Sequence, residues 1–84
     1  MTRKEYRIDL KGVRSMRALH ARLDGVLPFP EAYGRNLDAL FDFLTEYGPR
    51  MKIVFIHAAA APAAFKRVCA DAMEETPGLE IVLA

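Results

Sequence analysis

The sequence predicts a small α/β fold, in which a three-stranded parallel β-sheet is packed by about three α-helices. Short apolar stretches at residues 6–10, 53–56 and 79–83 have the composition of strands. The intervals between them carry apolar residues at helical spacing. The order is therefore strand, two helices, strand, helix, strand. Alternation of this kind favours parallel strands joined by helical crossovers.

The first strand and first helix are indicated by a change in periodicity. Residues 6–10 alternate apolar and polar side chains, which is typical of a strand, and Lys11-Gly12 ends the alternation. Ser15 is suited to cap the first helix, because its hydroxyl can accept a hydrogen bond from the first turn. We expect this helix to end near Asp24. Its apolar face should consist of Met16, Leu19, His20 and Leu23.

The second helix follows a proline-rich passage at residues 28–30, which should be extended. Gly34 is predicted to supply a flexible turn position and Asn36 to cap the helix. Residues 47–49, Tyr-Gly-Pro, should stop it. The side chains expected to face the core are Leu37, Leu40, Phe41 and Leu44.

The last three elements end the chain. Residues 53–56 are a continuous, partly β-branched apolar run, the pattern of a strand covered on both faces. Pro62 suits the first position of the last helix, which should end at residues 77–78 before the closing strand at 79–83. The apolar stripe of that helix is predicted to be Phe65, Val68, Cys69, Ala72 and Met73.

Length and composition limit the classes of protein. A chain of 84 residues should form one domain, residues 1–84, that buries about 60–65% of its unfolded surface. No apolar run approaches the ~20 residues of a membrane span, and the opening residues lack the apolar segment of a secretory signal. The single cysteine, Cys69, excludes an internal disulfide and fits a reducing compartment. We therefore expect a cytoplasmic protein.

Charge is unevenly distributed along the chain. The net charge is +1, but residues 31–47 hold four acidic residues against Arg35 alone, a net of −3, which leaves +4 elsewhere. The nearly neutral total argues against non-specific nucleic-acid binding as the main role. A local acidic face favours one oriented contact with a basic partner.

Asp38 and Asp42 are the strongest site candidates, because they lie one helical turn apart on the same face. Like charges at this spacing destabilise an isolated helix by about 0.2–0.5 kcal/mol. Spacing alone favours a solvated polar face, with Asp38 also gaining from the helix dipole. A glycosidase pair would need a cleft and, usually, groups from different elements. The remaining interpretation is a surface that binds arginine, lysine or histidine of a partner.

The neighbours of the two aspartates strengthen the binding interpretation. Thr45 and Glu46 flank them, Phe41 lies at the border of the acidic and core faces, and Tyr33 and Tyr47 lie just outside the helix ends. Carboxylates ringed by aromatic residues are typical of the energetic centres of protein interfaces. Taken alone, Phe41 is more consistent with a core residue, whereas Tyr33 and Tyr47 fit either interpretation.

Catalytic and metal-binding chemistry is not indicated elsewhere. His20 should be a satisfied, half-buried residue, and His57 ends a strand without an assigned role. No histidine, cysteine or acidic pair has metal-ligand spacing, and Cys69 among apolar neighbours predicts a core residue. The chain has no glycine-rich phosphate loop and no G-x-S-x-G motif. We therefore predict no enzyme activity, no catalytic residue, no metal and no cofactor.

A basic cluster in the first 22 positions offers a different function. It could bind RNA phosphates, or it could be a solvated face that offsets the acidic one. Glu5 and Asp9 interrupt it. The cluster consists of Arg3, Lys4, Arg7, Lys11, Arg14, Arg17 and Arg22.

The motif YGxNLDALxDxL at residues 33–44 resembles the central motif of barstar, the family of intracellular inhibitors of a secreted bacterial ribonuclease. The similarity is strong at residues 30–47 and looser in the other elements. It implies a barstar-like fold and a stoichiometric inhibitor that occludes a basic active site. Asp42 would replace an RNA phosphate among catalytic arginines and a histidine, and Asp38 would pair with a further basic group. The other implied contacts are Asn36, Leu37, Phe41, Thr45 and Tyr47.

The chain also departs from the family pattern. Ala32 replaces a tyrosine, Phe41 and Tyr47 replace tryptophans, and Arg35 replaces an acidic residue, which should weaken the negative field. The segment before the last helix is shorter, so a short helix and a further acidic contact should be missing. The expected partner is a basic ribonuclease or a related nuclease or toxin, bound by a monomer without nucleic acid or membrane. The alternative is a barstar-like immunity or regulatory module for a partner that is not a ribonuclease.

Overall fold

The structure, a computed structural model, describes residues 3–84 and contains the predicted alternation of strands and helices. The elements are β1 (Lys4–Asp9), α1 (Met16–Asp24), α2 (Leu37–Tyr47), the 3₁₀ turn η1 (Gly48–Arg50), β2 (Met51–Ile56), α3 (Ala63–Glu75) and β3 (Glu80–Leu83). The fold class predicted from sequence, a three-stranded parallel sheet with three α-helices, is confirmed.

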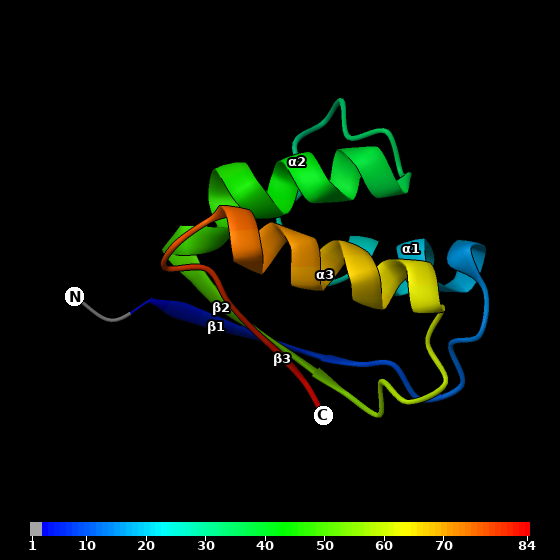
Figure 1. Ribbon diagram of the computed structural model, residues 1–84. Helices are drawn as coiled ribbons and strands as arrows, with labels where there is room; N and C mark the ends of the chain where they lie inside the picture. The colour runs from blue at the N-terminus through cyan, green and yellow to red at the C-terminus, as the bar shows by residue number, and fades with distance from the viewer. Residues whose placement is uncertain (1–2) are drawn as a thin grey trace.

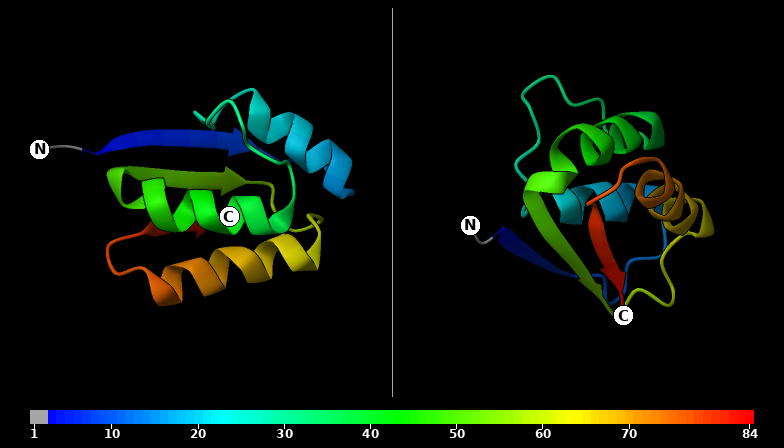
Figure 2. Two further views of the ribbon diagram at one scale, coloured as in Figure 1. Left: turned by 90° about the horizontal axis from the view of Figure 1, so that it is seen from above. Right: turned by 60° about the vertical axis from the view of Figure 1, so that its left-hand side comes forward.

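The sheet has the strand order β1-β2-β3, and both pairings are parallel. Ile8 lies opposite Phe55, and Tyr6 lies opposite Ile53, which in turn faces Ile81. All three helices lie on the same side of the sheet (Figures 1 and 2). Two crossovers of one hand that step in the same direction across a sheet place their helices on one face.

The expectation that β2 is covered on both faces is therefore wrong. Its inward residues Ile53 and Phe55 are buried beneath the helices, whereas Val54 on the opposite face is outside the core cluster. Val54 is nevertheless buried, because the strands on either side place Arg7 and Val82 beside it. We call the opposite side the open face; it carries Glu5, Arg7, Asp9, Lys52, Val54, Ile56, Glu80 and Val82.

Local signals determine most helix ends. The Ser15 hydroxyl accepts a hydrogen bond from the Ala18 backbone N–H at 3.1 Å, which confirms the predicted cap of α1. Pro62 precedes α3 rather than occupying its first position, because its ψ of 137° is extended. Within residues 3–84 no helix is long and apolar enough to cross a bilayer.

The core joins all three helices to the inner face of the sheet. The core face of α2 is wider than predicted, because it also includes the buried Phe43. At the other edge of this face, Leu37 and Phe41 are only partly buried. Two sides of α2 are therefore covered. This leaves one narrow side, carrying acidic residues, exposed.

Candidate functional site

The acidic residues of α2 form one exposed row. Asp38, Asp42 and Glu46 follow at four-residue intervals, and all three are exposed. Residues four apart are neighbours along a helix surface, so the carboxylates lie one above another. Within the described part of the chain, none of them forms an ion pair. We call Asp38, Asp42 and Glu46 the acidic row.

Asn36 fixes the start of the helix that carries the row. Its side-chain Oδ1 accepts a hydrogen bond from the Ala39 backbone N–H at 2.8 Å, as predicted for an N-cap. Its Nδ2 donates to the Gly34 carbonyl at 3.4 Å. The amide is thus occupied by the helix start. Asp38 follows in the first turn, where the helix dipole favours a carboxylate.

Gly34 has a different role from the one predicted. The left-handed backbone conformation in this turn belongs to Arg35, whose φ is 50°. A Cβ at Gly34 would lie 3.2 Å from Nδ2 of Asn36. Glycine suits this position because the capping side chain folds back against the backbone, and a Cβ here would push that side chain by a few tenths of an ångström.

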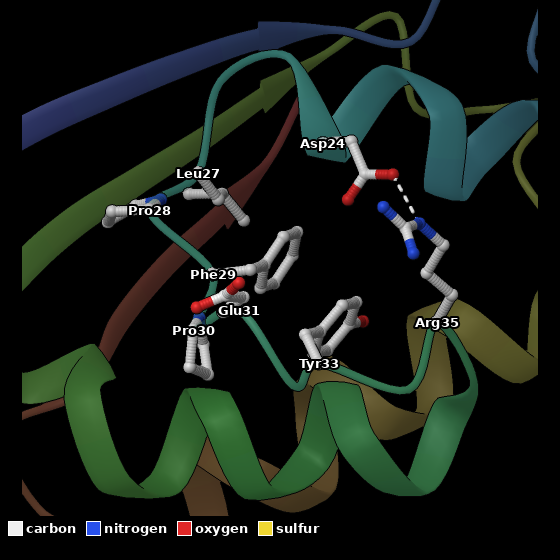
Figure 3. Close-up of a pocket in the computed structure, with 8 residues that line it drawn as sticks. All are labelled: Asp24, Leu27, Pro28, Phe29, Pro30, Glu31, Tyr33 and Arg35. Atoms are coloured by element: carbon white, nitrogen blue, oxygen red, sulfur yellow. Dashed lines mark hydrogen bonds and ion pairs between the residues drawn. The ribbon is translucent and has the colours of Figure 1, made fainter.

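An aromatic row connects the loop of residues 28–35 to α2. Tyr33 is stacked on Phe29, with ring centroids 3.8 Å apart and an angle of 6° between the rings. Figure 3 shows the two side chains next to each other. Phe29 contacts the buried Phe43 edge-on at 4.7 Å, and Phe43 lies 5.4 Å from the ring of Tyr47. Aromatic pairs of this kind contribute about 0.5–1.5 kcal/mol beyond burial. Tyr33 and Tyr47 therefore support the site from both of its ends.

A shallow groove separates this loop from the acidic row. Its volume is 180 Å³, and Asp42 and Glu46 lie at its border with the row. Ala32, an exposed residue, contributes only a methyl group to it. The groove offers aromatic and carboxylate groups together. It is lined by Pro30, Ala32, Tyr33, Gly34, Ala39, Asp42, Phe43, Glu46 and Tyr47.

On the other side of the row, α2 and α3 form a second groove of 490 Å³. Leu37 and Asp38 line it from α2, and Arg67 and Asp71 line it from α3. Sequence analysis missed Asp71. No local pattern connects it to α2, and only the packing of α3 against α2 brings it to the same groove as Asp38.

Phe41 and Thr45 occupy the remaining positions near the row. Phe41 is half-buried against the core, in agreement with its predicted place at the border of two faces. The Thr45 hydroxyl donates to the Phe41 carbonyl at 3.0 Å. Hydroxyl groups commonly bond in this way to the preceding helical turn. The hydroxyl of Thr45 is therefore engaged within α2.

Comparison with known proteins identifies the family of this chain. Residues 3–80 match the family described as Barstar (barnase inhibitor). The chain belongs to the barstar family. It is also similar to a protein of Bacillus subtilis (strain 168) named "Putative ribonuclease inhibitor YrdF", with 50% identity over 38 residues. The aligned segment covers 45% of this chain and 42% of the Bacillus protein.

Arg35 distinguishes this barstar-family chain at the edge of its site. Its Nε lies 2.6 Å from Oδ2 of Asp24, the last residue of α1. The Asp24 carboxylate raises the pKa of Arg35, through a hydrogen bond first and charge second. The positive charge is therefore matched locally, and it weakens the field of the acidic row less than the sequence suggested.

The histidines are outside the acidic row. His20 is buried and not fully satisfied, contrary to expectation: its Nδ1 lies 3.5 Å from the Tyr33 hydroxyl, while Nε2 has no partner among the described residues. His57 is exposed and pairs with Asp9 at 2.9 Å. Neither histidine belongs to a group of three or more metal-ligating residues in the described range.

Cys69 is fully buried in the core, as predicted. Burial raises the pKa of its thiol to about 12. A thiol with so high a pKa is almost entirely protonated near neutral pH and is a poor nucleophile.

The N-terminal basic residues do not gather into one patch. Arg3 donates to the Gly78 carbonyl and pairs with Glu80 at 2.7 Å, and Arg7 lies 3.5 Å from Glu5. Lys11 lies beyond the opposite end of β1, which at about 3.3 Å per residue places it some 20 Å or more from Arg3. The cluster seen in the sequence is thus divided between the two ends of the sheet.

Proposed function

We propose that this barstar-family chain is a stoichiometric inhibitor of a barnase-type ribonuclease, acting in the cytoplasm as one domain. The observation that carries the proposal is the acidic row: three exposed carboxylates on one side of a capped helix, without an ion-pair partner among residues 3–84. In the complex, Asp42 would take the place of an RNA phosphate among basic catalytic groups. Asp38 would pair with a further basic group, and Glu46 would border the contact.

The physical basis is occlusion by a preorganised surface. Because α2 is capped by Asn36 and packed on two sides, its carboxylates need little ordering when a partner binds. Carboxylates make short, charge-assisted and often bidentate hydrogen bonds with arginine. Inhibition of this kind requires no chemistry on the inhibitor. The description of the family and the name of the Bacillus relative support the same role.

The flanking residues would complete the contact. Tyr33 and Tyr47 form the aromatic side of the first groove, where a flat basic group could stack beside Asp42. Leu37 and Phe41 supply partly exposed apolar surface on the other side of the row. Asn36 and Thr45 would contribute mainly by holding the helix, since their polar groups are already engaged within it.

The test is a titration of the purified protein into a barnase-type ribonuclease while RNA cleavage is followed. We expect inhibition that is complete at one inhibitor per enzyme. The Asp42→Asn variant should inhibit about 10- to 100-fold more weakly, since hydrogen bonds to charged groups contribute about 1.5–3 kcal/mol. The Glu5→Gln variant removes one carboxylate from the open face and should inhibit like the wild type. Absence of inhibition at micromolar protein, or equal inhibition by Asp42→Asn, would refute the proposal.

A second candidate is a barstar-like immunity module for a different nuclease or toxin. The observation that favours it is Ala32, which leaves the first groove without the tyrosine found in the family prototype. If the wild type fails to inhibit a barnase-type ribonuclease but Ala32→Tyr inhibits it, the replacement of the tyrosine by Ala32 has changed which partner this groove binds. Inhibition by the wild type would exclude that conclusion.

A further inference from the structure

The loop of residues 28–35 borders a hollow at the end of α1. The hollow has a volume of 290 Å³. Its lining includes Phe29, Tyr33 and Arg35 of the loop and Asp24 of α1, which are drawn in Figure 3. Close packing therefore does not by itself determine where this part of the loop lies. Its position depends on three attachments: the Phe29–Tyr33 stack against α2, the contact of the Tyr33 hydroxyl with Nδ1 of His20 in α1 at 3.5 Å, and the Asp24–Arg35 ion pair across the hollow.

Both members of the ion pair are in locally unfavourable settings. Arg35 has a φ of 50°, a left-handed conformation that is uncommon for residues other than glycine, asparagine and aspartate. Asp24 is the last residue of α1, where the negative end of the helix dipole disfavours a carboxylate. Residues in an unfavourable backbone conformation or charge environment are held there by surrounding contacts, and they are concentrated at functional sites. Here the contact at 2.6 Å between the two side chains offsets part of the cost of both settings.

We infer that the Asp24–Arg35 ion pair is a clamp that positions the loop of residues 28–35 for the partner. Both are positioning residues. The consequence for binding rests on the proposed function, whereas the effect on the loop does not. Because Arg35 immediately precedes Asn36, the clamp joins the end of α1 to the cap of α2. It fixes Tyr33 and the groove beside Asp42 before a partner arrives.

The clamp can be separated from a general effect of charge. Asp24→Asn leaves the positive charge of Arg35 unmatched, which should slow association with a basic partner. Arg35→Asn leaves the negative charge of Asp24 unmatched, which should speed association. Loss of the clamp, by contrast, affects both variants in the same direction. Asparagine is the suitable replacement for Arg35, because it tolerates the left-handed conformation better than most residues.

The first experiment measures amide hydrogen exchange in the free protein by NMR. The Tyr33 backbone N–H donates to the Pro30 carbonyl within the loop at 2.9 Å, so it reports loop opening. We expect it to exchange about 2- to 5-fold faster in both Asp24→Asn and Arg35→Asn, the effect of losing an exposed ion pair. The Ala61 N–H, which donates to the Ala58 carbonyl in a distant turn, should be unchanged. The control variant Glu80→Gln breaks the exposed Arg3–Glu80 pair on the sheet and should leave Tyr33 unaffected.

The second experiment measures association and dissociation rates with a barnase-type ribonuclease. We expect dissociation to become about 2- to 5-fold faster in both variants, while the association rates change in opposite directions. Unchanged Tyr33 exchange in both variants, or faster dissociation in only one, would overturn the clamp. If the wild type does not bind the ribonuclease at all, the proposed function fails, and Tyr33 exchange still decides the clamp.

Discussion

Replacing Asp42 with asparagine should stabilise the free protein while it weakens inhibition. Asp42 has Asp38 four residues before it and Glu46 four residues after it, so it takes part in two like-charge contacts. Each such contact costs about 0.2–0.5 kcal/mol, which gives a gain of about 0.4–1 kcal/mol when Asp42 loses its charge. For a domain of this size the gain corresponds to a rise in Tm of roughly 2–8 °C.

Asp38→Asn is the matched comparison on the same helix. Within α2, Asp38 has one like-charge neighbour, and removing its charge relieves about 0.2–0.5 kcal/mol of repulsion. Across the second groove, α3 presents one charge of each sign, Arg67 and Asp71. Asp38 also lies in the first turn, where a carboxylate gains about 0.3–1 kcal/mol from the helix dipole. The variant should therefore be unchanged or less stable by a few tenths of a kcal/mol, about the difference of these two ranges. The two substitutions are chemically identical, yet only the one at Asp42 should stabilise the protein.

The assay is urea unfolding followed by far-UV circular dichroism, since the chain contains no tryptophan. It should be performed at low salt and at 1 M NaCl, where the Debye length falls to about 3 Å and exposed charges are screened. The advantage of Asp42→Asn should shrink at high salt. A less stable Asp42→Asn, or a gain that salt does not reduce, would show that repulsion within the acidic row is not what the substitution relieves.

Three further predictions concern the groups that support the site. Asn36→Ala removes the cap of α2 and should lower the free energy of unfolding by about 1 kcal/mol. Asn36→Ser should retain most of the stability that the cap provides, because the serine hydroxyl can also cap a helix. Equal urea midpoints for the two variants would contradict this prediction. Burial lowers the pKa of His20, so the unfolded chain takes up that proton first. With respect to this group, the free energy of unfolding is highest above the unfolded pKa of about 6.5 and decreases as the pH falls through the folded pKa. The urea midpoint of the wild type relative to that of His20→Leu should therefore fall between pH 7.5 and 5, and parallel profiles would argue against it. Cys69, with its thiol pKa raised to about 12, should react with a disulfide reagent at pH 8 only after unfolding in guanidinium, and rapid labelling of the native protein would disprove its burial.

The features that sequence analysis predicted well are local ones. Ser15 and Asn36 cap their helices through side chains that act within three residues, so the sequence around them contains the whole signal. The strands were found because short apolar runs separated by turns leave few alternatives. The positions of Asp38 and Asp42 on one exposed face followed from helical periodicity alone.

The features that were missed depend on contacts between distant segments. Phe43 was not assigned to the core, because its burial comes from Phe29 in the preceding loop and widens the apolar face of α2. The open face of the sheet was missed because an apolar run cannot show which strand lies in the centre. Arg35 was identified as a departure from the family, but its partner Asp24 lies in another element, and no pattern joins the two.

The parallel sheet limits what part of the chain can act alone. Lys4 lies opposite Met51, and Lys52 lies opposite Glu80, so every strand pairing joins segments far apart in sequence. At 11 residues, α2 is shorter than the ~12–15 residues at which isolated helices become even marginally stable in water. A synthetic peptide of residues 30–47 would therefore carry every acidic group of the row and still be largely unstructured. The peptide would bind a partner more weakly, because it would lose conformational entropy on binding, whereas the intact protein has already lost that entropy on folding.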